Sequence, residues 1–222
     1  MLRAIIFDFD GVICESLAAK TKAFRKLFEN YPDKLDEILK IHIDNGGMSR
    51  YKKFELIFKD ILKKELTEQE SRRLGQMFSE YCYAEVAACP FVEGAYEFLK
   101  KYHDKLFFFI VSGTPQEEMS SLVLDRKLDA FFKGVYGSPR VKDELITTIL
   151  RQNNLAREQV VFIGDSVNDQ QGAMKAWVTF VGRIYQGDAN PFTGLSEGQI
   201  IRNIKELEVV LRRQKLIPTI EN

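Results

Sequence analysis

Four short hydrophobic runs along the chain predict strands that are buried on both faces. The first covers Leu2 to Phe7 and is continuous apart from Arg3. The others lie at 106–111, 160–163 and 178–181, and each ends in polar or glycine-containing sequence. Uninterrupted runs of this length are typical of strands inside parallel sheets. Because stretches able to form helices follow these runs, the pattern predicts an α/β domain with a mostly parallel sheet.

Between residues 16 and 88, hydrophobic residues recur at intervals of three and four. They are Phe24, Leu27, Phe28, Leu35, Ile38, Leu39, Phe54, Ile57, Phe58, Ile61 and Leu62. That period is the one of amphipathic helices, and breaks at Tyr31-Pro32 and Asn45-Gly46-Gly47 separate the predicted helices. We therefore expect a core domain formed by 1–15 and 89–215, with a small all-helical domain, 16–88, inserted after the first strand.

The composition is ordinary for a globular protein and argues against several functional classes. Hydrophobic residues make up 45% of the chain and charged residues 29%. The 32 basic and 32 acidic residues balance, whereas nucleic-acid-binding domains carry a strong positive charge. No run is long enough to span a bilayer or to act as a secretory signal. We expect a cytoplasmic monomer or homodimer that binds neither nucleic acid nor membrane. The three cysteines lack the spacing of zinc ligands and are expected to be reduced.

Two pairs of aspartates follow predicted buried strands. Asp8 and Asp10 flank Phe9, and side chains two positions apart on a strand point to the same side. Asp165 and Asp169 follow the strand at 160–163. Ligands gather at the carboxyl ends of parallel strands, and Mg²⁺ prefers carboxylate, phosphate and water oxygens. The four aspartates are therefore candidates for a magnesium and phosphate site.

Two further segments carry groups suited to binding phosphate. Ser112 and Gly113 follow the second predicted strand, and the sequence pattern predicts that a helix starts there. The Ser112 hydroxyl and the Gly113 amide are suited to a phosphate, which binds exposed amides at helix N-termini. Lys142 opens another predicted helix and adds a cation near the same rim. A single lysine of this kind is usually solvated, so its significance depends on the other residues of the set.

These pieces together resemble the four motifs of the haloacid dehalogenase superfamily. The motifs correspond in order to 8–12, 112–114, Lys142 and 164–169, and the resemblance covers roughly 1–15 and 90–185. The helical insertion resembles the cap of the subfamily that includes phosphoglycolate phosphatase and β-phosphoglucomutase. The resemblance implies a Rossmann-like parallel-sheet core, an all-helical cap and a magnesium-dependent phosphatase.

The resemblance also implies roles for the two aspartates of the first motif. Asp8 would attack phosphorus and form an aspartyl phosphate, which divides the reaction into two steps. Asp10 would protonate the departing oxygen and then take a proton from the attacking water. Dehalogenases and phosphonatases carry other residues at the position of Asp10. Its presence therefore favours phosphate esters as substrates.

The same resemblance implies the ligands of the metal and of the phosphoryl group. Mg²⁺ would be held by the side chains of Asp8 and Asp165 and by the backbone carbonyl of Asp10. Asp169 would orient the metal shell directly or through water. The phosphoryl oxygens would be bound by Ser112, the amide of Gly113 and Lys142. Within the fourth motif, Ser166 is interpreted as a local structural residue and Asn168 has no assigned role.

The substrate is expected to be a small phosphorylated metabolite, such as a sugar phosphate or a phosphoglycolate-like acid. One alternative is a sugar phosphomutase of the β-phosphoglucomutase type, but Lys20 stands where those enzymes carry a histidine, twelve residues after the nucleophile. A second alternative is a module that binds phosphate without turnover. The retention of Asp10 argues against it, since binding alone places no demand on that residue.

Two positions outside the motifs have expected roles. Residues 46–50 resemble the glycine-serine-arginine loop of the sugar phosphate mutases, where the arginine binds the phosphate that is not transferred. Arg50 is therefore a candidate substrate ligand. The alternative is a helix start in which Ser49 is the N-cap and Arg50 to Lys53 form a basic, solvated face. Trp177 replaces a small residue of the family pattern and is expected to be a packing residue.

Overall fold

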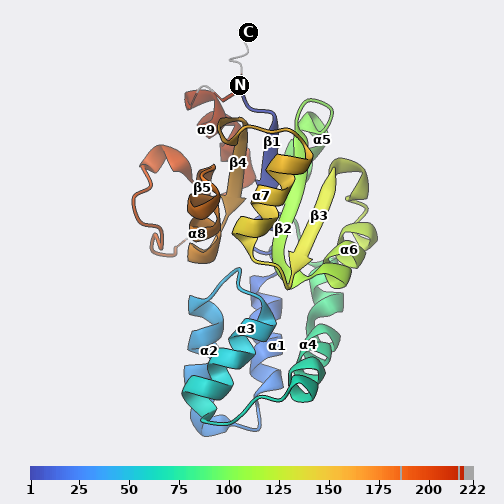
Figure 1. Ribbon diagram of the computed structural model, residues 1–222, viewed down its shortest axis with the longest axis vertical. Coiled ribbons are helices and arrows are strands. Elements are labelled where there is room, and N and C mark those ends of the chain that lie inside the picture. Colours follow the sequence, from blue (N-terminus) through green and yellow to red (C-terminus); the bar gives the residue numbers. More distant parts are fainter. Residues whose placement is uncertain (186, 215, 218–222) are drawn as a thin grey trace.

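Six parallel strands form a single sheet in the computed structural model, which describes residues 1–185, 187–214 and 216–217 (Figure 1). The strand order is β3-β2-β1-β4-β5-β6, and all neighbouring strands are parallel. Their bounds are Ala4–Phe7 for β1, Phe107–Pro115 for β2, Gly134–Ser138 for β3, Val160–Gly164 for β4, Thr179–Arg183 for β5 and Ile200–Ile201 for β6. The predicted parallel-sheet α/β fold is confirmed.

Helices cover both faces of the sheet, which explains why its central strands are continuous hydrophobic runs. Ile5 and Phe7 belong to the cluster that includes α5 (Ala95–Tyr102), α6 (Gln116–Asp125) and α9 (Leu207–Arg213). Ala4 and Ile6 belong to the cluster on the other face, with α7 (Lys142–Gln152) and α8 (Val167–Ala176). Consecutive residues of one strand therefore supply both hydrophobic cores.

The four predicted strands are the four central ones, and the two edge strands were not predicted. The sequence of β3 is GVYGS, and its first three residues are half-buried. The strand β6 contains only two residues. Edge strands contact fewer hydrophobic neighbours than central ones, so their sequences lack the uninterrupted apolar run from which the others were predicted.

The segment between β1 and β2 begins with helices, as its hydrophobic period predicts. We call residues 17–88 the helical insert; it contains α1 (Leu17–Leu27), α2 (Leu35–Asp44), α3 (Arg50–Leu56) with its π-helical continuation Ile57–Leu62, and α4 (Glu68–Ala88). In Figure 1 these helices lie together beyond the end of the sheet toward which the arrow of β3 points. The division into two domains stays a prediction, and its boundary at 215 lies outside the described residues.

Phe24 lies at the centre of the helical insert. Its ring packs against the rings of Phe28 and Phe54, each at a centroid distance of 5.8 Å, and of Phe78 at 5.1 Å. Aromatic rings at these distances add to the stability gained from burial alone. These rings pack together within the hydrophobic cluster that also includes Ile5 and Phe7 of the sheet.

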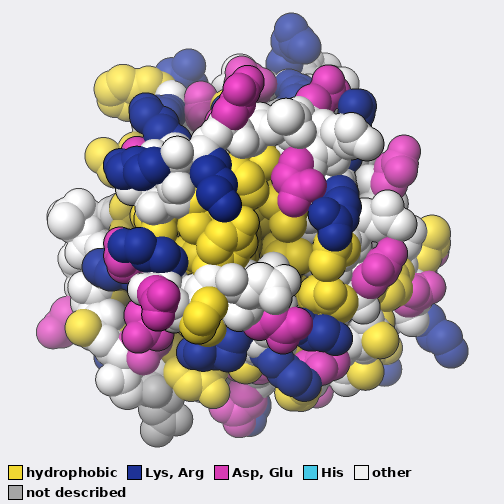
Figure 2. All heavy atoms as spheres, turned by 90° about the horizontal axis from the view of Figure 1, so that it is seen from below, with side chains coloured by type: hydrophobic (Ala, Val, Ile, Leu, Met, Phe, Trp, Pro, Cys, Tyr) yellow, Lys and Arg dark blue, Asp and Glu magenta, His cyan; other side chains and the backbone are white. Residues whose placement is uncertain are grey.

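The far end of the insert shows hydrophobic side chains at its centre, surrounded by interspersed basic and acidic ones (Figure 2). Charges of both signs thus share this face. In the described part of the chain, no helix is both long and apolar enough to cross a membrane.

The prediction that Trp177 is a packing residue is wrong. Its side chain is 74% exposed, and the residue follows the last turn of α8. Its φ is 59°, a left-handed conformation that ends the helix and turns the chain toward β5. The indole therefore projects away from the hydrophobic core.

Candidate active site

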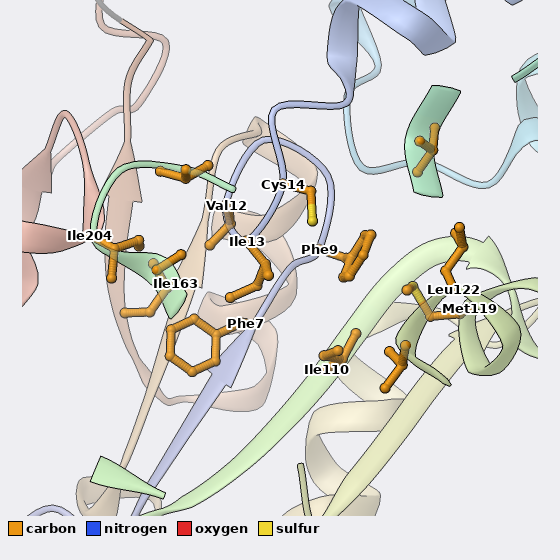
Figure 3. Packing of buried hydrophobic residues seen from close by; sticks show 14 of the residues in the cluster. Phe7, Phe9, Val12, Ile13, Cys14, Ile110, Met119, Leu122, Ile163 and Ile204 are labelled. Atoms are coloured by element: carbon orange, nitrogen blue, oxygen red, sulfur yellow. The ribbon is translucent and has the colours of Figure 1, made fainter. Parts of the chain in front are cut away.

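The loop after β1 directs its hydrophobic side chains into the core. Phe9, Ile13 and Cys14 are fully buried, and the amides of Ile13 and Cys14 both donate to the carbonyl of Phe9 at 3.0 Å. Figure 3 shows Phe9 and Ile13 within the hydrophobic cluster. Asp8 and Asp10, on either side of Phe9, line a cavity of about 790 Å³ whose other walls come from the helical insert, from the ends of β2 and β4 and from residues 188, 189 and 191 after β5. Core packing thus fixes the backbone that carries both carboxylates.

Asp8, Asp165 and Asp169 form a cluster at the carboxyl end of the sheet. One ligand oxygen from each lies within 4.8 Å of the others. Asp169 is held in the first turn of α8 by Ser166, whose backbone amide donates to Asp169 Oδ2 at 3.0 Å. The Ser166 hydroxyl accepts in turn from the Asp169 amide at 3.2 Å, completing a helix cap. The local structural role predicted for Ser166 is confirmed.

Lys142 is the cation of this cluster. Its Nζ donates to Asp8 Oδ2 at 2.8 Å and forms an ion pair with Asp169. The side chain is only 8% exposed, so Lys142 lies at the expected edge of the sheet but is buried there and not solvated. Burial opposes its charge, but the neighbouring carboxylates of Asp169 and Asp8 raise the pKa of Lys142 above its ordinary value. Lys142 is therefore held in its charged form.

The cluster has more negative charge than Lys142 balances. Burial raises the pKa of Asp8 to about 7; Lys142 lowers that pKa, while the charges of Asp169 and Asp10 raise it further. Burial, Asp169 and Asp8 also raise the pKa of Asp165 well above its ordinary value. A site with only oxygen donors and excess negative charge fits a hard divalent cation such as Mg²⁺.

The side chain of Asp10 faces a different set of groups. Its Oδ1 accepts from Ser16 Oγ at 2.6 Å, and its Oδ2 pairs with Lys20 and accepts from Thr114 Oγ1 at 3.2 Å. Lys20 Nζ also donates to Thr114 Oγ1 at 2.8 Å. Burial alone would raise the pKa of Asp10, but the charge and hydrogen bond of Lys20 lower it below the ordinary value. Asp10 is therefore held as a carboxylate in this arrangement.

Lys20 and Thr114 were missed as site residues by the sequence analysis. The signal for Lys20 is its position twelve residues after Asp8, where the sugar phosphomutases of the resemblance carry a histidine. Thr114 follows the predicted phosphate-binding pair directly, and its contact with Asp10 joins residues 104 positions apart. Only the folded chain shows that contact.

Ser112 and Gly113 lie at the expected end of β2 but not at a helix start. The strand continues to Pro115 and α6 begins at Gln116, so the predicted placement at the start of the helix is wrong. The strand is longer because Pro115 still pairs with Ser138 of β3 after an irregularity in the register. Ser112 is buried, and its Oγ accepts from the Thr114 amide at 3.1 Å.

The loop of the helical insert at 45–48 lies directly on the core part of the site. A Cβ on Gly113 would be 2.5 Å from the carbonyl oxygen of Gly47, so a larger residue would separate the two backbones. Asn168 Nδ2 donates to the carbonyl of Gly46 at 2.7 Å. Asn168, which had no predicted role, thus connects the fourth motif to the insert.

Arg50 and Lys53 are buried, at 4% and 6% exposure, so the alternative of a solvated basic face is wrong for both. The Arg50 guanidinium donates to the carbonyl of Gly75 at 3.2 Å, to Ser79 Oγ and to Glu118 Oε1 at 2.7 Å. It borders the same cavity as Asp8. Whether Arg50 binds substrate stays a prediction.

The comparisons with known proteins agree with the fold and the order of the motifs. The model of the haloacid dehalogenase-like hydrolase family matches residues 5–183. The chain belongs to this family. Its sheet and helices also resemble the crystal structure of a hydrolase of the family, YfnB from Bacillus subtilis, which was solved with bound magnesium. That likeness has a TM-score of 0.70 at 21% identity and covers 95% of this chain and 98% of the other.

Two curated relatives of this haloacid dehalogenase-like hydrolase are phosphatases. A phosphorylated carbohydrates phosphatase of Thermotoga maritima is 27% identical over 196 residues, which are 83% of this chain and 84% of the relative. A phosphoglycolate phosphatase of Aliivibrio fischeri is 26% identical over 186 residues, which are 79% and 81% of the two chains. The predicted enzyme class, a phosphatase of this family, is confirmed.

Proposed function

We propose that this phosphatase hydrolyses a small phosphorylated metabolite, a sugar phosphate or a phosphoglycolate-like acid, with Mg²⁺ and through an aspartyl phosphate on Asp8. The observation that carries the proposal is the cluster of Asp8, Asp165, Asp169 and Lys142 at the end of the sheet, in which Asp165 is half-buried and the other three are buried; Asp8 and Asp165 line the cavity. The curated relatives, which act on phosphorylated carbohydrates and phosphoglycolate, support this class of substrate. The cytoplasmic location and the oligomeric state stay predictions.

Asp8 would act as the nucleophile. Its Oδ1 accepts from the Phe9 amide at 2.7 Å and its Oδ2 from Lys142, so the carboxylate is fixed in orientation. In the first step a bond forms between an Asp8 oxygen and phosphorus while the bond from phosphorus to the leaving oxygen breaks. Water then attacks the same phosphorus and releases phosphate and Asp8.

Asp10 would transfer the proton in both steps. While paired with Lys20 it is a carboxylate, which is the form that accepts a proton from the attacking water. To act first as an acid it must gain a proton. An anionic substrate favours this, because negative charge beside a carboxylate raises its pKa. The contact with Thr114 would hold Asp10 near the leaving oxygen.

The acidic cluster would hold the metal through the side chains of Asp8 and Asp165 and the backbone carbonyl of Asp10. Asp169 would orient this shell while keeping its ion pair with Lys142. When bound, Mg²⁺ would neutralise charge on the phosphoryl oxygens and on Asp8. Ser112, the Gly113 amide and Lys142 would bind the remaining phosphoryl oxygens.

Release of phosphate from p-nitrophenyl phosphate tests the proposed reaction. The purified protein should release phosphate in the presence of Mg²⁺, and Asp8→Asn should not. A screen of sugar phosphates and phosphorylated acids then identifies the substrate. Wild-type protein that binds phosphate esters but releases none would favour the binding-module alternative. Isomerised sugar phosphate without net phosphate release would favour the mutase.

A further inference from the structure

Lys53 is a buried lysine on the wall of the cavity that the helical insert provides. It lies on α3, is 6% exposed and lines the same cavity as Asp8 and Asp10. Its Nζ donates to the carbonyl of His42 at 2.9 Å and lies 3.3 Å from His42 Nδ1. The ammonium group is therefore held in one place by the backbone and ring of a single neighbour.

The charge of Lys53 has no anionic partner in the described part of the chain. His42 provides acceptors for two of the three N–H groups, which leaves one for a ligand in the cavity. Asp10 pairs with Lys20, and Asp44 pairs with Lys40 at 2.6 Å. No Asp or Glu among the described residues forms an ion pair with Lys53.

His42 orients Lys53 without contributing charge. Its ring stacks on Phe24 at a centroid distance of 4.0 Å, and burial, together with Lys53 and Lys20, lowers the pKa of His42 to about 2. The ring is therefore neutral, and the hydrogen-bond network assigns its proton to Nε2, facing Thr21 Oγ1 at 3.4 Å. Nδ1 is then free to accept from Lys53.

Arg50 differs from Lys53 although both border the cavity. The Arg50 guanidinium is already bonded to Glu118, to Ser79 and to the Gly75 carbonyl. A substrate could use Arg50 fully only by opening these bonds. A buried lysine without a paired counter-ion is unfavourable. Burial, followed by the charge of Lys20, lowers the pKa of Lys53 to about 7, although the more distant charges of Asp10 and Asp165 act in the opposite direction. An anion in the cavity would compensate this charge.

We propose that Lys53 binds a second anionic group of the substrate, a carboxylate or a second phosphate, while the transferred phosphoryl group lies at Asp8 and Lys142. This inference rests on the proposed function and narrows its substrate class to phosphate esters with two anionic groups. The cavity of about 790 Å³ is within the range of sites for small metabolites. Lys53 is thus a residue that determines specificity.

Matched pairs of substrates test the inference. The pairs are 2-phosphoglycolate with 2-hydroxyethyl phosphate, 3-phosphoglycerate with glycerol 3-phosphate, and fructose 1,6-bisphosphate with fructose 6-phosphate. For each pair, the ratio of kcat/KM measures the benefit of the second anionic group. We expect a ratio of about 10 to 100 in at least one pair, as for one charge-assisted contact. The pair that shows it distinguishes a carboxylate from a second phosphate.

Variants then locate the contact. Lys53→Met should reduce the ratio to within about threefold of one, and the larger loss of kcat/KM should fall on the substrate that carries the second anionic group. Lys53→Arg should retain part of the ratio. Lys52→Met is the matched control, because Lys52 is exposed and pairs with Glu55 at 2.8 Å. It should keep the wild-type ratio. Lys53→Gln, which retains a donor for His42, is measured in parallel so that the result does not depend on one variant's folding.

Three outcomes would overturn the inference. An unchanged ratio in both Lys53→Met and Lys53→Gln would mean that another residue binds the second group. Ratios near one in every wild-type pair, with both members hydrolysed, would mean that there is no such group. If wild-type protein released no phosphate from any ester, p-nitrophenyl phosphate included, the proposed function itself would fail, and this inference with it.

Discussion

Arg50 of the helical insert and Glu118 of α6 form a buried ion pair, with 2.7 Å between Arg50 Nη2 and Glu118 Oε1. Their side chains are 4% and 11% exposed, and Ser79 of α4 also donates to Glu118. The guanidinium lies over the ring of Phe78 at 4.5 Å. The pair therefore connects the insert to α6 of the core through a charge that has little access to water.

Arg50→Ala should destabilise the protein, because it leaves Glu118 buried without its counter-ion. We expect a loss of about 3–5 kcal/mol in the free energy of unfolding, measured by urea denaturation. Lys22→Ala is the control, since Lys22 and Glu85 form an exposed pair worth about 0–1 kcal/mol. The double variant Arg50→Ala/Glu118→Ala should lose less than the sum of the single variants. Additive losses would mean that the pair is not coupled.

Asp8→Asn should abolish turnover while the protein stays folded. The variant removes the proposed nucleophile and one charge from a cluster in which burial already raises the pKa of Asp8 to about 7. We expect phosphate release to fall by at least about 10³-fold and the thermal midpoint to stay within a few degrees of the wild type. Residual activity close to the wild type would contradict an aspartyl phosphate on Asp8.

Activity should require Mg²⁺ and be poorly supported by Ca²⁺. The cluster of Asp8, Asp165 and Asp169 offers oxygen ligands within 4.8 Å of one another. Ca²⁺ is larger and accepts more ligands, which disturbs the octahedral geometry that an in-line transfer needs. Excess chelator should remove phosphate release and added Mg²⁺ should restore it. Full turnover in chelator would show that the carboxylates act without a metal.

Much of the fold and of the core motifs could be predicted from the sequence because the information is local. Buried central strands are continuous hydrophobic runs, and the carboxyl ends of parallel strands lie at one edge, so Asp8 and Asp165 could be expected to meet. The surroundings of Arg50 and Lys53 could not be predicted. A basic residue in a helix start has the same local pattern whether it faces solvent or a cavity. The contact of Arg50 with Glu118, 68 positions away, decides between them.

Replacing Lys53 should change how stability depends on pH, apart from any effect on activity. The folded-state pKa of Lys53 is about 7, below its ordinary value of 10.5. Between these values the unfolded chain binds the proton and the folded chain does not, so this group makes stability rise as pH rises from 7 to 10.5. The slope is at most about 1.4 kcal/mol per pH unit.

Urea denaturation of the wild type and of Lys53→Met, repeated at several pH values across this range, measures how the free energy of unfolding of each depends on pH. The difference in the free energy of unfolding between the wild type and Lys53→Met should change with pH between 7 and 10.5 and be constant above pH 10.5. Lys52→Met should follow the wild type at every pH. A gap that does not vary with pH would mean that Lys53 titrates normally in the folded protein.

Gly47→Ala should impair catalysis because the new Cβ would clash sterically with the site, in addition to the backbone strain that the substitution causes. Gly47 has a φ of +68°, and a Cβ there would lie 2.5 Å from Ser166 Oγ and 3.1 Å from Lys142 Nζ. The loop would have to move away from the proposed phosphate site, so we expect kcat/KM to fall by about tenfold or more, as for a loss of about 1.4 kcal/mol. Gly194→Ala provides the control, because Gly194 has a φ of +73° with nothing within 4 Å of a Cβ. Both variants should lose about 1–2 kcal/mol of stability from the left-handed conformation, but only Gly47→Ala should lose activity. Equal turnover in the two variants would mean that the loop does not lie against Lys142 during the reaction.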